Sequence, residues 1–136
     1  MTEYLDLEDL LAAAEAAVGG PPEVRDIGLL ESAAVRPRTT VFGADAYPDL
    51  DGKAAALLHS IVSSHPLVDG NKRLGWVAVR LFYLLNDAGI RARDDDAYEL
   101  VVSIADGRLQ DIQPIAERLA SWRTSGGRTR RARAGR

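Results

Sequence analysis

Apolar residues recur every three to four positions along most of this chain, and that spacing places them on one face of an α-helix. Five long segments show the pattern clearly, and a sixth, shorter segment is compatible with it. No stretch alternates apolar and polar residues for long enough to predict a central β-strand. We therefore expect an all-α bundle whose helices lie near residues 7–18, 28–35, 54–62, 74–88, 97–104 and 112–119.

Local signals mark the ends of these helices. Asp6 is placed to cap the first helix, and Gly19 begins a Gly-Gly-Pro sequence that stops it. Pro37 ends the short second helix. The stripe that follows residue 73 is the longest and closes at Gly89, so we expect its helix to be the central and most buried one. Its apolar positions are Leu74, Val77, Ala78, Leu81, Leu84, Leu85 and Ala88.

Composition limits the class of protein. The chain has 136 residues, 46% of them hydrophobic and 27% charged, which is typical of one globular domain. It has no cysteine, which excludes thiol redox catalysis, zinc-cysteine sites and a disulfide framework. Residues 1–9 are acidic and no apolar run is long enough for a membrane span. We expect a cytoplasmic protein with no membrane partner.

Charge is distributed unevenly along the chain. All 20 acidic residues and 12 of the 17 basic residues lie before Ser125, which leaves this body with a net charge of -8. Residues 126–136 carry five arginines and no acid. We predict a folded domain over residues 1–123 and a disordered basic tail over residues 124–136. We assign no role to the tail, and no direct nucleic-acid binding is expected of the folded domain.

Residues 36–50 interrupt the helical pattern. β-branched and aromatic residues followed by glycine, proline and aspartate favour a β-hairpin or flap on the bundle surface. Two interpretations are open: the exposed edge aligns a peptide substrate by backbone pairing, or the segment is an ordered connector without a ligand. The candidate substrate-flap residues are Thr39, Thr40, Val41, Phe42 and Gly43.

Residues 65–73 read His-Pro-Leu-Val-Asp-Gly-Asn-Lys-Arg and stand directly before the longest apolar stripe. They combine a base, a carboxylate, a flexible glycine, an amide and two cations at the predicted start of a helix. Unpaired backbone N–H groups and the helix dipole favour an anion at that place. The segment is therefore predicted to bind phosphate, with Gly70, Asn71, Lys72 and Arg73 as the binding residues.

Each side chain of this motif suggests a role. His65 is a candidate general base because imidazole titrates near neutral pH. Asp69 either ligates Mg²⁺ or caps the following helix, and Asn71 either orients a phosphate oxygen or braces the loop. Lys72 and Arg73 should bind phosphate oxygens, since cations at a helix start oppose its dipole unless an anion compensates them. The candidate catalytic residues are thus His65, Asp69, Lys72 and Arg73, and the candidate metal ligand is Asp69.

Other chemically suggestive residues have structural interpretations. Asp94, Asp95 and Asp96 stand just before an apolar helix, and we expect them to form its N-terminal cap, with favourable placement against the helix dipole, rather than a metal cluster. His59 lies within a predicted helix and is expected to be structural. Trp76 and Trp122 are expected to pack within the bundle or to contact a partner.

The motif resembles the signature of the Fic/Doc superfamily, and specifically its Doc branch, the death-on-curing toxins. Members that transfer AMP have glycine at the position of Lys72, whereas Doc-type members have lysine. Leu67 stands where the family usually has phenylalanine and is expected to anchor the loop in the core. The resemblance extends upstream through the segment beginning at Arg25 and downstream to the acidic turn after Gly89, so it covers nearly all of residues 1–122.

This resemblance implies a Fic/Doc-type helical fold and an activity. Doc-type proteins use ATP and Mg²⁺ to phosphorylate a threonine of elongation factor Tu, which blocks translation. It implies that His65 is the base, that Lys72 crowds the anion site of AMP transferases so that the nucleotide binds reversed, and that residues 39–44 align the target. Two alternatives are open: transfer of AMP to a protein hydroxyl, and an inactive Doc-like binding module.

The resemblance also implies a partner. Many Fic proteins inhibit themselves with a helix that carries glutamate followed by glycine or asparagine, and no glutamate of this chain is followed by either residue. A toxin without that element needs a separate inhibitor. Doc relatives pair with a Phd-type antitoxin, whose C-terminal helix lies in a hydrophobic groove.

Overall fold

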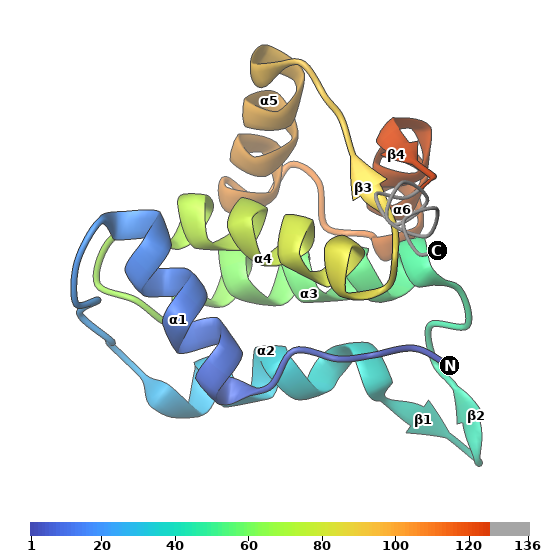
Figure 1. Ribbon diagram of the computed structural model, residues 1–136, viewed down its shortest axis with the longest axis horizontal. Coiled ribbons are helices and arrows are strands. Elements are labelled where there is room, and N and C mark those ends of the chain that lie inside the picture. The colour runs from blue at the N-terminus through green and yellow to red at the C-terminus, as the bar shows by residue number, and fades with distance from the viewer. Residues whose placement is uncertain (126–136) are drawn as a thin grey trace, which may run out of the picture.

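The computed structural model describes residues 1–125 (Figure 1). The described residues contain six α-helices, each in a segment where the apolar spacing predicted one. Asp6 caps the first helix, and Gly19 ends it in a left-handed conformation, as predicted. The all-α bundle is confirmed, and none of its helices within residues 1–125 is long and apolar enough to cross a membrane. The helices are α1 (Leu7–Val18), α2 (Ile27–Val35), α3 (Leu50–Ser64), α4 (Asn71–Leu85), α5 (Asp94–Ala105) and α6 (Ile112–Trp122), with a 3-10 turn, η1 (Arg36–Arg38), after α2.

The central helix is α3, and the prediction that the helix after the motif is the most buried was wrong. Ten of the fifteen residues of α3 are buried, because its small alanines at positions 54–56 allow α2, η1, α4, α5 and α6 to approach it from all sides. Helix α4 buries only six of its fifteen residues. Its apolar stripe is wider than the face that other elements cover, and Leu81, Leu84 and Leu85 are 37%, 58% and 43% exposed.

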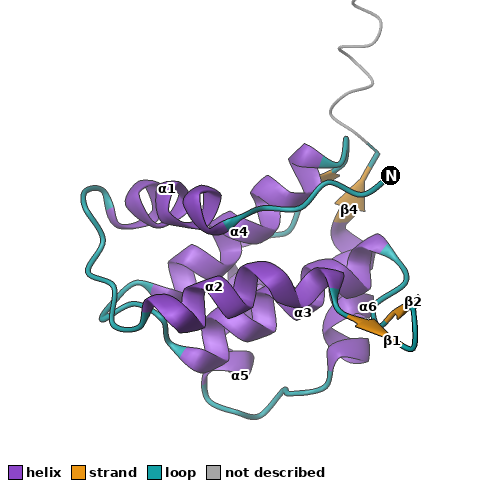
Figure 2. Cartoon of the chain, turned by 90° about the horizontal axis from the view of Figure 1, so that it is seen from below, coloured by secondary structure: helices purple, strands orange, loops and turns teal. Residues whose placement is uncertain are grey.

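The predicted surface hairpin forms before α3. Strands β1 (Thr40–Val41) and β2 (Ala44–Asp45) pair antiparallel, and the two turn residues, Phe42 and Gly43, both have positive φ. This is the backbone of a type I′ turn, which matches the twist of a two-stranded ribbon. The hairpin lies at the N-terminal end of α3, and the 65–73 loop follows the C-terminal end of the same helix (Figures 1 and 2).

A second short ladder was not predicted. Strand β3 (Gly89–Ile90) pairs antiparallel with β4 (Arg123–Thr124), so Thr124, which we had assigned to the tail, belongs to the folded domain. Residues 126–136 of the predicted tail lie outside the described residues. Helix α4 ends at Leu85, before the predicted stop at Gly89, because the Asn86 side chain donates to the carbonyls of Phe82 and Glu3. Two-residue strands are too short for an alternating sequence pattern to reveal them.

Candidate functional site

The 65–73 motif forms the loop between α3 and α4. The chain leaves α3 at His65, which has a left-handed backbone (φ 56°), and enters α4 through Gly70, which also has positive φ (92°). Leu67 is 1% exposed and anchors the loop in the core, as predicted. A Cβ atom at position 70 would lie 2.7 Å from Cγ1 of Val18 in α1, so only glycine fits there without a shift.

The Asn71 side chain braces the loop internally. Its Nδ2 donates to the Leu67 carbonyl (2.9 Å), and its Oδ1 accepts from the Leu67 N–H (2.8 Å). Both polar atoms of the amide are thereby used on the backbone of one buried residue. Of the two interpretations that the sequence left open for Asn71, the structure supports bracing.

Residues 23–26 support the loop from the outside. The N–H groups of Arg25 and Asp26 donate to the Pro66 carbonyl, at 2.7 and 3.0 Å, and the Val68 N–H donates to the Glu23 carbonyl at 2.9 Å. The Arg25 guanidinium adds two side-chain bonds, to the carbonyls of Ser64 (2.8 Å) and His65 (2.7 Å). The motif loop is therefore fixed on both sides, by the core and by a segment 40 residues earlier in the chain.

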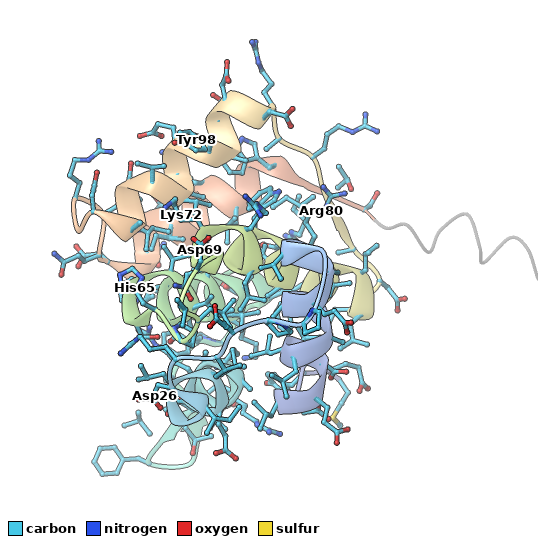
Figure 3. The ribbon with its side chains drawn as sticks, turned by 90° about the vertical axis from the view of Figure 1, so that its left-hand side faces the viewer. Asp26, His65, Asp69, Lys72, Arg80 and Tyr98 are labelled. Atoms are coloured by element: carbon cyan, nitrogen blue, oxygen red, sulfur yellow. The ribbon has the colours of Figure 1, made fainter. Side chains whose placement is uncertain are left out.

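The motif opens onto a pocket of about 420 Å³ between the start of α4 and helix α5. Figure 3 shows His65, Asp69 and Lys72 at one end of the bundle, with Tyr98 on the neighbouring α5. All six predicted catalytic and phosphate-binding residues line this single pocket. Its lining residues are His65, Val68, Asp69, Gly70, Asn71, Lys72, Arg73, Trp76, Asp94, Ala97, Tyr98 and Val101.

The pocket is suited to an anion. No side chain caps the first turn of α4, so the backbone N–H groups at its start have no side-chain acceptor and the positive end of the helix dipole is open. Lys72 and Arg73 are exposed in this turn. The only hydrogen bond of the Arg73 guanidinium within residues 1–125 is a long one (3.4 Å), to the Ala17 carbonyl. Two cations and free amides therefore face the same space, which is the arrangement that binds phosphate.

Asp69 is available as a metal ligand. It does not cap α4, and within the described residues its exposed carboxylate makes no hydrogen bond or ion pair. No group of three or more acidic or histidine side chains that could hold a metal ion occurs in residues 1–125. This donor set fits Mg²⁺, which keeps several water ligands and combines one or two carboxylates with substrate phosphates.

The second wall of the pocket was missed from the sequence. Helix α5 contributes Asp94, Ala97, Tyr98 and Val101, and α4 contributes Trp76. Trp76 also packs edge-on against Trp122 of α6, with ring centroids 6.2 Å apart, which confirms its predicted packing role. The one signal of this wall in the sequence was Tyr98, an aromatic residue on an amphipathic helix, and it is 67% exposed in the structure. Which helix faces the motif is a tertiary property that spacing does not reveal.

The flap residues do not line this pocket. Helix α3 separates the hairpin from the motif, and fifteen residues at ~1.5 Å each give a length of ~22 Å. Arg36 holds the base of the hairpin on α3 by hydrogen bonds to the Tyr47 hydroxyl (3.0 Å), Nδ1 of His59 (2.8 Å) and the Ser60 hydroxyl (3.1 Å). The substrate role of residues 39–43 stays a prediction.

His59 has the structural role that was predicted, whereas the predicted cap formed by the acidic run is wrong and only its favourable placement at the helix start is confirmed. Burial and, to a smaller extent, the Arg36 guanidinium hold the pKa of His59 below its usual value of 6.5. Its Nδ1 therefore accepts the hydrogen bond from Arg36. Asp94–Asp96 occupy the first turn of α5, where their charge is favourable against the helix dipole, although no side chain of the three makes a capping bond.

Comparison with known proteins agrees with this geometry. A family model described as the Fic/DOC family matches residues 4–83, more than half of the chain. The chain belongs to the Fic/DOC family. It is also similar to toxin Doc of Mycolicibacterium smegmatis (strain ATCC 700084 / mc(2)155), with 48% identity over 123 residues that cover 90% of this chain and 95% of that toxin. The predicted membership of the Fic/Doc superfamily and its Doc branch is confirmed, and the protein is a homologue of toxin Doc.

The Fic/Doc family match divides the site in two. It includes the hairpin, α3, the whole 65–73 motif and all of α4 except its last two residues, and it ends at residue 83. Helix α5, which carries the second wall of the pocket, lies beyond it. The motif side of the pocket is thus the part shared with the family model, and the α5 wall lies outside that match.

Proposed function

We propose that this Fic/Doc protein transfers the terminal phosphate of ATP to a protein hydroxyl, a threonine of elongation factor Tu, and so blocks translation as a toxin. The observation that carries the proposal is the single pocket in which His65, Asp69 and the cations Lys72 and Arg73 meet an uncapped helix start. Similarity to toxin Doc supports the toxin role.

The residues have distinct tasks in this reaction. The target hydroxyl attacks the γ-phosphorus while His65 takes its proton, and the bond from that phosphorus to the β,γ-bridging oxygen breaks to release ADP. Lys72, Arg73 and the amides of the first turn of α4 stabilise the charge on the phosphoryl oxygens. Mg²⁺, held by Asp69, would neutralise charge on the β- and γ-phosphates. Asn71 and Gly70 keep the loop in the required shape.

Lys72 favours phosphate transfer over AMP transfer. In the Doc-type motif it replaces the glycine of AMP-transferring relatives, and its side chain occupies space in the anion site. The nucleotide then binds with its γ-phosphate at the motif. The apolar wall formed by Trp76, Tyr98 and Val101 offers a surface for the nucleobase at the other side of the pocket.

The deciding experiment measures mass. The protein is incubated with Mg-ATP and elongation factor Tu, and the intact mass of the factor is determined alongside a His65→Ala reaction. A phosphate-sized gain that disappears in the variant supports the proposal. An AMP-sized gain would replace it with adenylylation, the first alternative.

The second alternative, a binding module without catalysis, is tested by nucleotide titration. An active enzyme binds ATP more tightly with Mg²⁺ present, and Asp69→Asn removes that Mg²⁺ dependence. A module would show no Mg²⁺-dependent affinity. The intact set of base, carboxylate and cations around one pocket favours the enzyme.

The partner that we propose is a Phd-type antitoxin. Leu81, Leu84 and Leu85 form an exposed apolar face at helical spacing on α4. An amphipathic helix of the antitoxin can bury such a face. Co-expression tests this: the antitoxin should restore growth of cells that express the protein, and harmless expression of the active protein alone in its native host would contradict the need for a partner.

A further inference from the structure

Arg25 makes contacts that the proposed reaction does not yet explain. Its Nε donates to the carbonyl of His65 (2.7 Å) and its second guanidinium nitrogen donates to the carbonyl of Ser64 (2.8 Å). Both carbonyls belong to the C-terminal end of α3, where backbone oxygens lack partners within the helix and the dipole is negative. A planar guanidinium is the side chain best suited to hold two such acceptors at once.

His65 connects these hydrogen bonds to the pocket, because its carbonyl accepts one of them and the residue also lines the pocket. Its backbone is left-handed (φ 56°, ψ 62°), a conformation that non-glycine residues adopt only when their surroundings impose it. On its N-terminal side the His65 N–H donates to Ile61, and the next carbonyl, that of Pro66, accepts two N–H groups from residues 25 and 26. The Arg25 side chain thus fixes the peptide unit that contains the His65 carbonyl. The backbone N–H groups of residues 25 and 26 fix the following unit, which contains the Pro66 carbonyl.

We propose that Arg25 is a positioning residue for His65: by clamping the carbonyls of Ser64 and His65, it holds His65 in the left-handed conformation from which the imidazole lines the pocket. Arg25 does not line the pocket itself, so it acts through His65. The inference rests on the proposed role of His65 as general base. A side chain outside the motif would then determine the placement of the base.

Kinetics supply the first test. Arg25→Gln removes the charge and the bidentate geometry but leaves the backbone bonds of residues 23–26 available. We expect kcat to fall by about 10- to 100-fold, as a misplaced catalytic group does, with KM for ATP nearly unchanged because the phosphate-binding residues are untouched. Arg25→Lys, which can reach one carbonyl, should lose less. Arg108→Gln is the matched control, since Arg108 is an exposed arginine that pairs locally with Asp106 outside the pocket.

A second readout is independent of activity. The chain has two histidines, so its imidazole NMR spectrum contains two sets of signals, and His65→Ala identifies which set belongs to residue 65. Arg25→Gln should shift or broaden the His65 signals and leave those of His59 in place. If wild-type protein transfers no phosphate, the proposed function fails, yet this spectrum still tests the positioning.

Two results would overturn the inference. One is Arg25→Gln with unchanged kcat and unchanged His65 signals. The other is a lower kcat with the His65 signals unchanged, which would mean that Arg25 acts on something other than the base. If Arg25→Gln does not fold, the same two measurements on Arg25→Lys decide, because lysine keeps the charge at the end of α3.

Discussion

Gly70 determines how the motif enters α4. Alanine at this position would adopt a left-handed backbone at a cost of about 1–2 kcal/mol, and its Cβ would lie 2.7 Å from Val18 Cγ1 in α1. We expect Gly70→Ala to lower the free energy of unfolding by at least this amount in urea titration and to reduce phosphate transfer, because the amides at the start of α4 shift.

Gly20→Ala is the matched control for that prediction. Gly20 has no atom within 4 Å of the position of an added Cβ, and its φ is not positive. This variant should keep both the stability and the activity of the wild type. Equal behaviour of the two variants would show that the positive φ at position 70 is not required.

His59 makes stability depend on pH. Its pKa is lowered in the folded protein, so the unfolded chain binds a proton more readily, and stability is lost as pH falls below 6.5. The free energy of unfolding should therefore be smaller at about pH 5.5 than at about pH 7.5. In His59→Asn, the side-chain oxygen can still accept a hydrogen bond from Arg36. The difference in the free energy of unfolding between the two pH values should be smaller in this variant. An identical pH dependence in the variant would exclude His59 as its source.

At the scale of elements, α4 shows the limit of apolar periodicity. The spacing predicted correctly that this helix has an apolar stripe, but it did not reveal which part of the stripe other helices cover. Leu74 and Ala78 are buried against the bundle, whereas Leu81, Leu84 and Leu85 near the other end are exposed. Sequence spacing alone therefore does not show which part of an apolar stripe the fold buries.

We use this exposed face to test the proposed antitoxin contact. Leu84→Asp should weaken binding of the antitoxin by roughly tenfold or more, because a carboxylate would be desolvated in an apolar interface. Isothermal titration measures the affinity, and phosphate transfer should be unchanged. Val35→Asp is the control, since Val35 is similarly exposed but lies on α2. An unaltered affinity in Leu84→Asp would place the antitoxin elsewhere.

At the scale of the whole molecule, a polar cluster formed by the buried Tyr83 and Asp51 and the exposed Arg123 joins three distant segments. The Tyr83 hydroxyl of α4 donates to Asp51 at the start of α3 (2.7 Å), and Arg123 of β4 pairs with the same carboxylate oxygen (3.2 Å). Burial first, and then the hydrogen bond to Asp51, raise the pKa of Tyr83 well above its usual range. The hydroxyl therefore stays protonated and keeps donating.

Tyr83→Phe tests the energetic weight of this cluster. It removes a donor from Asp51, whose side chain is only 13% exposed, so we expect a loss of about 1–3 kcal/mol in the free energy of unfolding, measured in urea. Tyr4→Phe is the control, because the Tyr4 ring packs on Phe82 while its hydroxyl makes no hydrogen bond within residues 1–125. Equal stability of Tyr83→Phe and the wild type would show that Arg123 alone satisfies Asp51.

The sequence alone determined the presence of the helices, the Asp6 and Gly19 caps, the surface hairpin and the motif side of the site, since each depends on residues that are close in the chain. Helical spacing, the Asp6 cap and the nine residues of the motif are local properties. Tertiary packing decided the rest: α3 rather than α4 lies at the centre, α5 supplies the second wall, the hairpin lies at the far end of α3, and Arg25 reaches the end of α3 from 40 residues away. Those features depend on which helix faces pack together and on which side chains reach the carbonyls at a helix end. The spacing of residues along the chain does not determine either.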